Sequence, residues 1–517
     1  MRASFGRVDL TPRTPIALCG LGGRREPYTS IGMPIEVDAA VLREDARAAV
    51  LVSGDFLYFP GSLRDRLVGA FGKSHGISAA DVLLAASHTH FAPNLDRSKP
   101  HLGAIDDDYV AFVEERVEAL VGRLLQTAGA TVAVRHQRLV SRHNINRRVL
   151  TIDAEAVRVL DAAYCDPGGP CDPGLDVLRF DAQRGALCGV LVRYSCDPVC
   201  LPAPLELSPE FPGVIRRKLR DEVGLPELPV LYVQGYAGQL RPEANRFRAG
   251  GMTASAEASL APVPCSEFSR PAWEKWAGSI AGDALAALGA AAETPMLAAS
   301  LAAGERKLPL AAVIEDLPAE HGGATLSIQA IKIADDMLLV AMSAEPTSAW
   351  SEIVCDLAPG KIVIPVGCAN QVYGYLPSAR EVAQGGWEAG DFLSQFGLDG
   401  RFRPGFAECV AGELAALLAA FDEPGAAACR DRIAALRGVI DKLWTQRDEA
   451  RALMMRARAA QSAAETRLAA ITERAEDLEK AAAHLRELLG KATSRIREFE
   501  RTRSPGEAAA GRADGQV

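Results

Sequence analysis

The chain has 517 residues, of which 48% are apolar and 24% charged, and its formal net charge is -9. This balance excludes a wholly disordered, collagen-like or membrane-embedded protein, and no apolar stretch approaches the roughly 18 residues of a membrane span. The acidic total does not favour nucleic-acid binding, and the start of the chain lacks the apolar core of a signal peptide. Eleven cysteines without a C-x-x-C pair predict mostly reduced thiols in a cytoplasmic protein.

Short apolar runs typical of buried strands recur through the first part of the chain. They lie at 48–52, 82–86, 189–193, 230–233, 337–341 and 361–365. Helical patterns at 109–125 and 271–291 separate some of these runs. We therefore predict one α/β domain over residues 1–424, built on a large mixed sheet flanked by helices. No G-x-G-x-x-G follows the first strand and no phosphate-binding loop motif occurs, so the sequence gives no support to nucleotide binding.

The clearest local motif is Ser87-His88-Thr89-His90, which directly follows the apolar run 82–86. In open α/β sheets, ligands bind where strands end. Two histidines two residues apart at such an end can present one imidazole to a metal and the other beside it. On its own, the motif leaves a metal site and a polar loop as alternatives.

Three further polar segments follow apolar runs. They are Tyr194–Pro198, Ser343–Thr347 and Asn370–Pro377. The segment Asn144–Arg148 adds a pair of arginines that could bind a carboxylate or polarise a carbonyl group. Polar groups after several strands favour one shared site at the edge of the sheet.

The chain changes character near residue 424, and a heptad register begins at Ile433. The predicted seam holds Ile433, Ile440, Arg447, Met454, Gln461, Leu468, Ala475, Ala482, Leu489 and Ile496 at a, and Leu436, Leu443, Ala450, Ala457, Ala464, Ile471, Leu478, Leu485, Ala492 and Phe499 at d. This period predicts a coiled coil over 430–503, which forms a homo-oligomer through 433–499, and a disordered tail over 504–517. A solvated single helix, or one folded back on the globular part, is the alternative.

These motifs together resemble the catalytic domain of the neutral/alkaline, non-lysosomal ceramidases, over about residues 5–421. The matching segments are Phe5–Thr11, Ser87–His90, Asn146–Arg147, Phe211–Gly213, Gln234–Gly238, the segment around Glu345, and Asn370–Tyr375. Each match is short, and their common order and spacing carry the resemblance. The coiled coil stands where the family has an immunoglobulin-like domain.

The resemblance implies a zinc site with His88, Glu345 and Tyr375 as three of its ligands. The family's second histidine falls on Asp197, which is a departure. A carboxylate oxygen does ligate zinc, but the resulting set is harder and more anionic, which admits another divalent metal such as Mn²⁺ or Mg²⁺, or weakens binding. A strand-end cap for Asp197 and a core position for Tyr375 remain structural alternatives.

The resemblance also implies catalytic roles for three residues. His90 would handle protons beside the metal, and Arg147 matches an arginine near the reacting carbonyl. Trp387 stands where the family has a tyrosine that assists the carbonyl oxygen; an indole N–H donates a hydrogen bond but protonates nothing. A second departure is Gly238-Gln239, where the family has a Gly-Asp pair.

The expected function is therefore metal-dependent hydrolysis of an N-acyl amide bond. The metal would lower the pKa of a water, His90 would carry the proton to the leaving amine, and Arg147 with Trp387 would stabilise the oxyanion. The departures leave a rival function, an inactive ceramidase-like scaffold that acts through coiled-coil contacts. A third hypothesis is a peripheral membrane enzyme, because ceramide resides in membranes.

Overall fold

The computed structural model describes most of the chain up to residue 421 and a few short pieces beyond it. The described residues are 1–22, 24–153, 156–159, 164–245, 263–264, 267–421, 446–447, 449–450, 480, 482 and 485–494. The chain divides into two compact units. The first comprises Met1–Val149, Arg158–Val354 and Val363–Ala420, and the second comprises Leu150–Val157, Cys355–Ile362 and Phe421–Val517.

An eight-stranded mixed sheet dominates the first unit, in the order β14-β12-β11-β6-β1-β3-β4-β5. Its strands are β1 (Arg2–Asp9), β3 (Glu36–Glu44), β4 (Arg47–Gly54), β5 (Val82–Ala86), β6 (Ala130–Val140), β11 (Gly174–Ala182), β12 (Leu187–Tyr194) and β14 (Val230–Gln234). The pairs β4–β5 and β12–β14 are parallel, and the other neighbours are antiparallel. The predicted mixed sheet is confirmed, and every predicted strand of this part of the chain lies in it.

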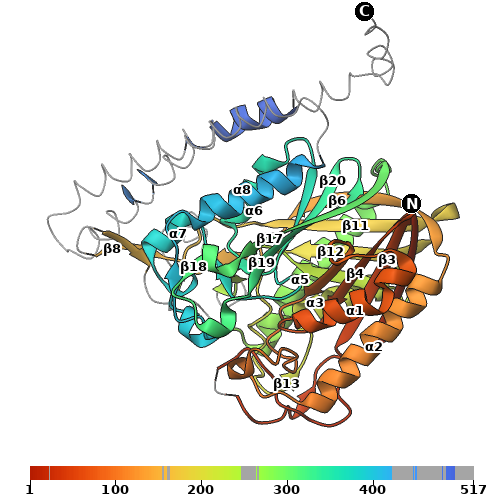
Figure 1. Ribbon diagram of the computed structural model, residues 1–517, viewed down its shortest axis with the longest axis horizontal. Coiled ribbons are helices and arrows are strands. Elements are labelled where there is room, and N and C mark those ends of the chain that lie inside the picture. The colour runs from red at the N-terminus through yellow and green to blue at the C-terminus, as the bar shows by residue number, and fades with distance from the viewer. Residues whose placement is uncertain are drawn as a thin grey trace, which may run out of the picture. The chain divides into compact units, whose positions relative to one another are not determined.

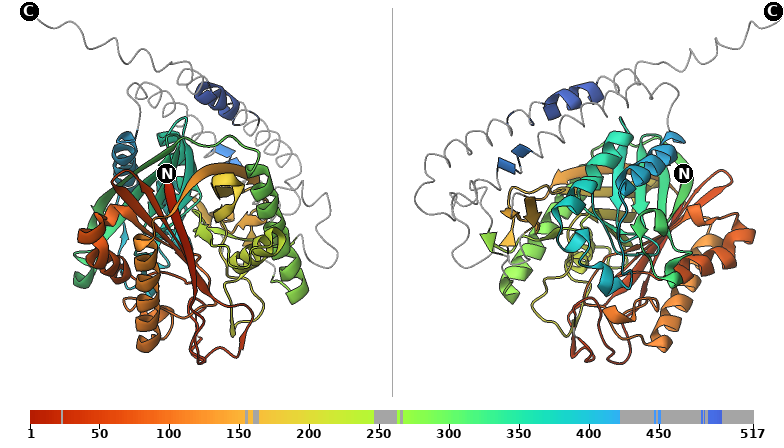
Figure 2. Two further views of the ribbon diagram at one scale, coloured as in Figure 1. Left: turned by 90° about the vertical axis from the view of Figure 1, so that its right-hand side faces the viewer. Right: turned by 60° about the vertical axis from the view of Figure 1, so that its left-hand side comes forward.

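Helices cover the large sheet on both sides, which explains why β5 and β14 are mostly apolar and are buried along their whole length. The four main helices are α1 (Gly61–His75), α2 (Asp107–Gln126), α3 (Phe211–Val223) and α5 (Arg270–Ala291). In Figure 2 (left), α1 and α2 lie on one side of the strands and α3 and α5 on the other. The predicted helices at 109–125 and 271–291 correspond to α2 and α5.

Aromatic packing fixes α3 and α5 against each other and against the sheet. Phe211 begins α3 and lies edge-on to Trp276 of α5, with ring centroids 5.3 Å apart. The same ring lies 5.6 Å from Tyr232 of β14, again edge-on. Both α3 and α5 therefore share one core with β14 and β12, and this core supports the strand ends that carry the site.

A second sheet has four strands, in the order β17-β19-β20-β22. They are β17 (Ala299–Pro309), β19 (Thr325–Ala334), β20 (Met337–Met342) and β22 (Ile362–Val366). Helix α8 (Phe406–Ala419) packs on β17 and β19 (Figure 1). Helix α6 (Ala349–Leu357) follows soon after β20, so a loop between them carries Glu345.

The remaining strands have two to four residues and form short two-stranded ladders. The remaining strands are β2 (Ser30–Ile31), β7 (Asn144–Asn146), β8 (Leu150–Asp153), β9 (Ala156–Val159), β10 (Tyr164–Cys165), β13 (Glu206–Leu207), β15 (Leu240–Pro242), β16 (Val263–Pro264), β18 (Ile314–Glu315), β21 (Glu345–Pro346), β23 (Tyr375–Leu376) and β24 (Arg401–Phe402). The ladders β7–β15 and β21–β23 matter most for the site. Helix α7 (Ala379–Gln384) and a 3₁₀ turn, η7 (Trp387–Ala389), follow β23.

Most of the predicted coiled coil over 430–503, and the tail over 504–517, lie outside the described residues. Within the described pieces, residues 485–494 are helical. The predicted seam positions Arg447, Ala450 and Ala482 are buried. Oligomer formation through 433–499 therefore stays a prediction.

Two further expectations concern compartment and membrane. Among the described residues, no helix is both long and apolar enough to cross a bilayer. The expected free thiols are found at the buried Cys19, Cys196 and Cys368, whereas Cys165 is disulfide-bonded. Because disulfides persist mainly in oxidising compartments, the cytoplasmic location remains a prediction.

Candidate active site

The two ends of the large sheet approach each other, and this brings together loops that strand order alone would separate. The hydroxyl of Ser53 in β4 donates to the backbone carbonyl of Tyr232 in β14. The carboxyl ends of the parallel pairs β4–β5 and β12–β14 therefore meet. The backbone N–H of His90, after β5, donates to the carbonyl of Pro198, after β12, at 3.2 Å. One polar site thus forms from loops that follow several strands.

At the centre of this site, the imidazole of His88 faces the carboxylate of Glu345. Nε2 of His88 lies 3.4 Å from Oε2 of Glu345, and the two side chains are only 2% and 3% exposed. Nδ1 of His88 lies 3.2 Å from the carbonyl of Leu57. Because a carbonyl only accepts, Nδ1 carries a hydrogen and Nε2 is the nitrogen directed at the carboxylate.

Electrostatics make this a strongly coupled pair. Burial lowers the pKa of His88, but the neighbouring Cys368 and Glu345 raise it well above its ordinary value. Burial raises the pKa of Glu345, and the opposing effect of His88 leaves it below its ordinary value. The phenol of Tyr58 donates to Oε1 of Glu345, whereas Oε2 accepts no hydrogen bond from the described residues.

Tyr375 is placed beside Glu345 by backbone pairing. The two residues are register partners in the parallel ladder β21–β23, and the N–H of Glu345 donates to the carbonyl of Gly374 at 2.9 Å. The Tyr375 ring packs edge-on to Phe392, at 5.1 Å, and to Trp387, at 6.4 Å. Burial and the Glu345 carboxylate raise the pKa of the Tyr375 phenol. Trp387 therefore borders the site through Tyr375.

Asp197 is buried near the start of the loop after β12. Its N–H donates to the carbonyl of Leu240 at 3.1 Å, and Oδ1 accepts from Nε2 of Gln234 at 3.2 Å. Burial raises the pKa of Asp197 to about 7, although the positive charges of His88 and Arg147 lower it. Asp197 thus lies within electrostatic reach of His88 and Glu345. With a pKa of about 7, its carboxyl group exchanges its proton near neutral pH.

Arg147 follows β7 and is held by a buried carboxylate. Its Nε donates to Oε1 of Glu388 at 2.6 Å, and Nη2 donates to the carbonyl of Gly238 at 2.9 Å. The guanidinium lies 5.7 Å from the centre of the Tyr375 ring. Arg148 binds the other oxygen of the same carboxylate at 2.7 Å. Glu388 therefore fixes the direction of Arg147.

His90 packs edge-on against His88, with ring centroids 5.0 Å apart. Burial and the charge of His88 lower the pKa of His90 to about 3, so His90 is neutral at physiological pH. Gly20 covers this imidazole with a positive φ of 90°, and a Cβ there would lie 2.6 Å from Nδ1 of His90. Only glycine satisfies both the backbone conformation and the close approach.

The sequence-based site omitted several residues that the structure brings in. Besides Tyr58 and Glu388, the thiol of Cys368 is buried and hydrogen-bonded to His88. Burial raises the pKa of this thiol to about 11. Cys368 lies beside β5 because its carbonyl accepts from the N–H of Ala86 at 3.2 Å. No local motif signals this contact, although Glu388 follows the predicted Trp387 directly.

The donors suit a divalent metal in chemistry, but they are only partly assembled. Within the described part of the chain, no three His, Cys, Asp or Glu side chains form a metal-binding group. His88 and Glu345 supply one nitrogen and one buried oxygen, 3.4 Å apart, and the oxygen accepts no hydrogen bond from the described residues. These are the donor types that zinc takes in catalytic sites. Tyr375 is the register partner of Glu345, and Asp197 lies within electrostatic reach of the pair.

The fold is a large mixed α/β architecture with a polar site where strands end, and it matches solved ceramidase structures. Neutral ceramidase from Pseudomonas aeruginosa superposes with a TM-score of 0.61 at 16% identity, covering 81% of this chain and 74% of that one. A ceramidase complexed with C2 superposes with a TM-score of 0.59 at 17% identity and the same coverage. No family model and no curated protein matches the sequence. The chain therefore has a ceramidase-like fold, as the resemblance predicted.

Proposed function

We propose that this protein is a metal-dependent hydrolase of a linear N-acyl amide bond in a ceramide-like substrate. The observation that carries the proposal is the buried Oε2 of Glu345, which accepts no hydrogen bond from the described residues and lies 3.4 Å from Nε2 of His88. A buried carboxylate is costly unless a positive charge lies beside it, and a bound divalent metal would supply that charge. The ceramidase-like fold supports the choice of reaction class.

His88 and Glu345 would hold the metal, with Asp197 and Tyr375 as the further ligands. When bound, zinc supplies Lewis-acid polarisation of the amide carbonyl and of the attacking water. The two carboxylates make the donor set hard, so Mn²⁺ and Mg²⁺ are the alternatives to test beside zinc. In the metal-free protein, a proton on His88 takes the place of that positive charge, which the raised pKa of His88 supports.

The remaining residues would transfer the proton and stabilise the oxyanion. The His90 ring lies edge-on to His88, so His90 is placed to take a proton from the attacking water and return it to the leaving amine. Arg147 presents a fixed positive charge where negative charge develops on the carbonyl oxygen. The indole of Trp387 can add one hydrogen bond to that oxygen.

Metal content and hydrolysis together test the proposal. Purified protein is analysed by elemental mass spectrometry and assayed on a panel of short-chain and long-chain N-acyl amines and amino sugars. We expect about one metal equivalent per chain, lost in His88→Ala and kept in the control His75→Ala, together with hydrolysis of at least one panel member. A folded protein that binds no divalent metal would refute the proposal.

An inactive scaffold is the second candidate, favoured by the lack of a preassembled three-residue metal group among the described residues. In that case the site would bind no metal and the C-terminal segment would carry the function. The metal analysis separates the two candidates, because only the hydrolase loses metal when His88 is replaced.

A further inference from the structure

A loop outside the predicted site contacts both members of the central pair. This loop, residues 55–59, follows β4 and is buried throughout. It runs beside the His88 loop, since the N–H of Ser87 donates to the carbonyl of Gly54 at 2.8 Å and the N–H of His88 to that of Phe56 at 2.9 Å. Loop and site are therefore joined through the backbone.

The loop orients the imidazole of His88 through a backbone group. The carbonyl of Leu57 accepts from Nδ1 of His88 at 3.2 Å and so directs Nε2 toward Glu345. A hydrogen bond of this kind sets both the tautomer and the ring direction of a histidine ligand. Because the acceptor belongs to the main chain, the loop conformation itself is what matters.

The next residue orients the carboxylate. The hydroxyl of Tyr58 donates to Oε1 of Glu345, and both side chains are almost fully buried. A donor on Oε1 stops the carboxylate from exchanging its two oxygens by rotation and leaves Oε2 beside His88. Charge-assisted hydrogen bonds in such a buried place are strong, and water cannot easily replace them.

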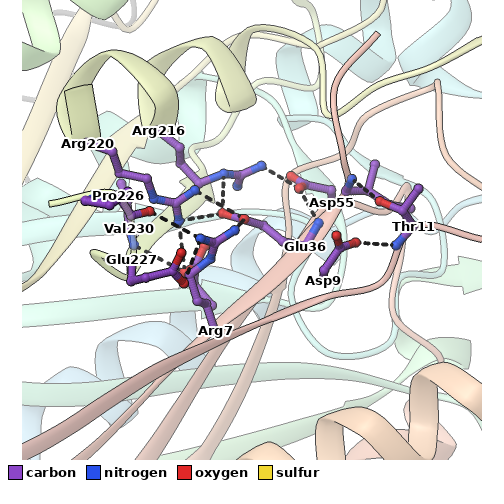
Figure 3. Close-up of polar contacts among 12 residues, drawn as sticks. Arg7, Asp9, Thr11, Glu36, Asp55, Arg216, Arg220, Pro226, Glu227 and Val230 are labelled. Atoms are coloured by element: carbon purple, nitrogen blue, oxygen red, sulfur yellow. Dashed lines mark hydrogen bonds and ion pairs between the residues drawn. The ribbon is translucent and has the colours of Figure 1, made fainter. Parts of the chain in front are cut away.

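A buried ion-pair cluster holds the loop in place (Figure 3). The carboxylate of Asp55 accepts from the guanidinium of Arg216 and from the N–H of Glu36, the latter at 2.9 Å. Nε of Arg216 also lies 3.0 Å from Oε1 of Glu36, and Arg220 binds the same carboxylate at 2.6 Å. These residues join β3 and α3, so the loop start is fixed from two elements.

We propose that Tyr58 is a positioning residue, which holds the Glu345 carboxylate with Oε2 directed at His88. The proposal rests on the proposed function in that Glu345 is taken as a metal-holding residue. It adds a hydroxyl from residues 55–59, a loop that none of the ceramidase-like sequence motifs covers. It also gives the buried cluster of Asp55, Arg216 and Glu36 a role in the site.

Zinc affinity of Tyr58→Phe provides the first test, measured by competition with a chromophoric chelator. Phenylalanine keeps the ring and removes only the hydroxyl. We expect the Kd for zinc to rise about 10-fold to 100-fold, the usual effect of losing a group that orients a ligand. The matched control is Tyr109→Phe, because the buried Tyr109 hydroxyl donates to a backbone carbonyl, that of Leu10, at 2.7 Å. Equal zinc affinity in both variants would overturn the proposal.

Crystal structures of metal-free wild-type and Tyr58→Phe proteins provide the second test. We expect the Glu345 carboxylate to rotate in the variant, which changes its distance from His88. An unchanged carboxylate would overturn the positioning role. This comparison needs no metal, so it still decides the role of Tyr58 if the wild-type protein binds no zinc and the proposed function fails.

Discussion

Glu345 and Tyr375 are register partners in a two-stranded parallel ladder, which places their side chains next to each other. One residue follows β20 and the other comes after β22, so the pairing joins segments that are well separated in sequence. The N–H of Gly238 donates to the carbonyl of Pro346 at 2.9 Å and ties a third loop to the same ladder. The site thus depends on backbone pairing outside the main sheets.

Arg147→Lys is expected to lower kcat by about 100-fold with a smaller change in KM, because the oxyanion loses a fixed donor. Lysine keeps the charge but lacks the planar group that reaches Glu388 and the Gly238 carbonyl together. The measurement is steady-state hydrolysis of the best N-acyl substrate. The control is Arg148→Lys, because Arg148 binds the other oxygen of the same carboxylate. This variant should have a lower free energy of unfolding and a nearly unchanged kcat. Equal losses of kcat in the two variants would contradict the role of Arg147 in stabilising the oxyanion.

Gly20→Ala is expected to disturb His90 as well as the backbone. A positive φ costs a non-glycine residue about 1–2 kcal/mol, and the new Cβ would also meet Nδ1 of His90 at 2.6 Å. Gly76→Ala is the matched control, because Gly76 has a φ of 66° and open space around its Cβ position. Urea unfolding should show a lower free energy of unfolding in both variants, with the larger decrease in Gly20→Ala. The rate of hydrolysis should fall only in Gly20→Ala. Full activity in that variant would show that the close packing on His90 is unimportant.

Part of this fold follows from hydrophobic pattern, and the exceptions have a physical cause. Strands such as β4, β5 and β14 are apolar runs because both of their faces are covered. Strand β3 carries the acidic residues Glu36 and Asp38, so its pattern does not indicate a buried strand. The structure places Arg216 and Arg220 of α3 against the buried Glu36 carboxylate (Figure 3). Arg220 also lies 3.4 Å from the buried Asp38 carboxylate. A pattern of side-chain polarity cannot reveal such pairing from a distant helix.

The site, like the fold, could be predicted from the sequence only in part. His88 and Glu345 each follow an apolar run, so they could be predicted as residues at strand ends. The family resemblance adds Tyr375. Tyr58 and Cys368 sit within apolar segments and read as core residues. They enter the site only because their loops pair with β5 and its continuation, as when the carbonyl of Cys368 accepts from the N–H of Ala86 at 3.2 Å. These contacts depend on tertiary structure.

Stability should depend on pH through Glu210, which caps α3. Burial raises the pKa of Glu210 to about 7, even though the N–H of Phe211 donates to its carboxylate. In the unfolded chain the pKa of this carboxyl group is about 4.5. Between pH 4.5 and 7, Glu210 is therefore ionised in the unfolded state but still protonated in the folded state. The free energy of unfolding therefore falls as pH rises through this window, and the contribution levels off above pH 7.

Glu210→Gln tests this effect by removing the titration. Relative to wild type, the variant should gain up to about 3 kcal/mol as pH rises from 4.5 to 7, at about 1.4 kcal/mol per pKa unit. The measurement is urea unfolding at several pH values. The exposed Glu222→Gln, which removes an ion pair with Lys218, is the control and should show no such gain. If the free energies of unfolding of wild type and Glu210→Gln change in parallel with pH, the raised pKa of Glu210 is ruled out.

Oligomer formation should depend on the predicted seam of the C-terminal segment. Two charges at seam positions, in Leu436→Glu with Leu485→Glu, are expected to separate the chains, because buried like charges oppose pairing. Light scattering coupled to size-exclusion chromatography would report a lower mass. Lys480→Glu changes charge at an outer heptad position and should keep the mass of the wild type. A monomeric wild type, with the same mass in the seam variant, would contradict the predicted oligomer.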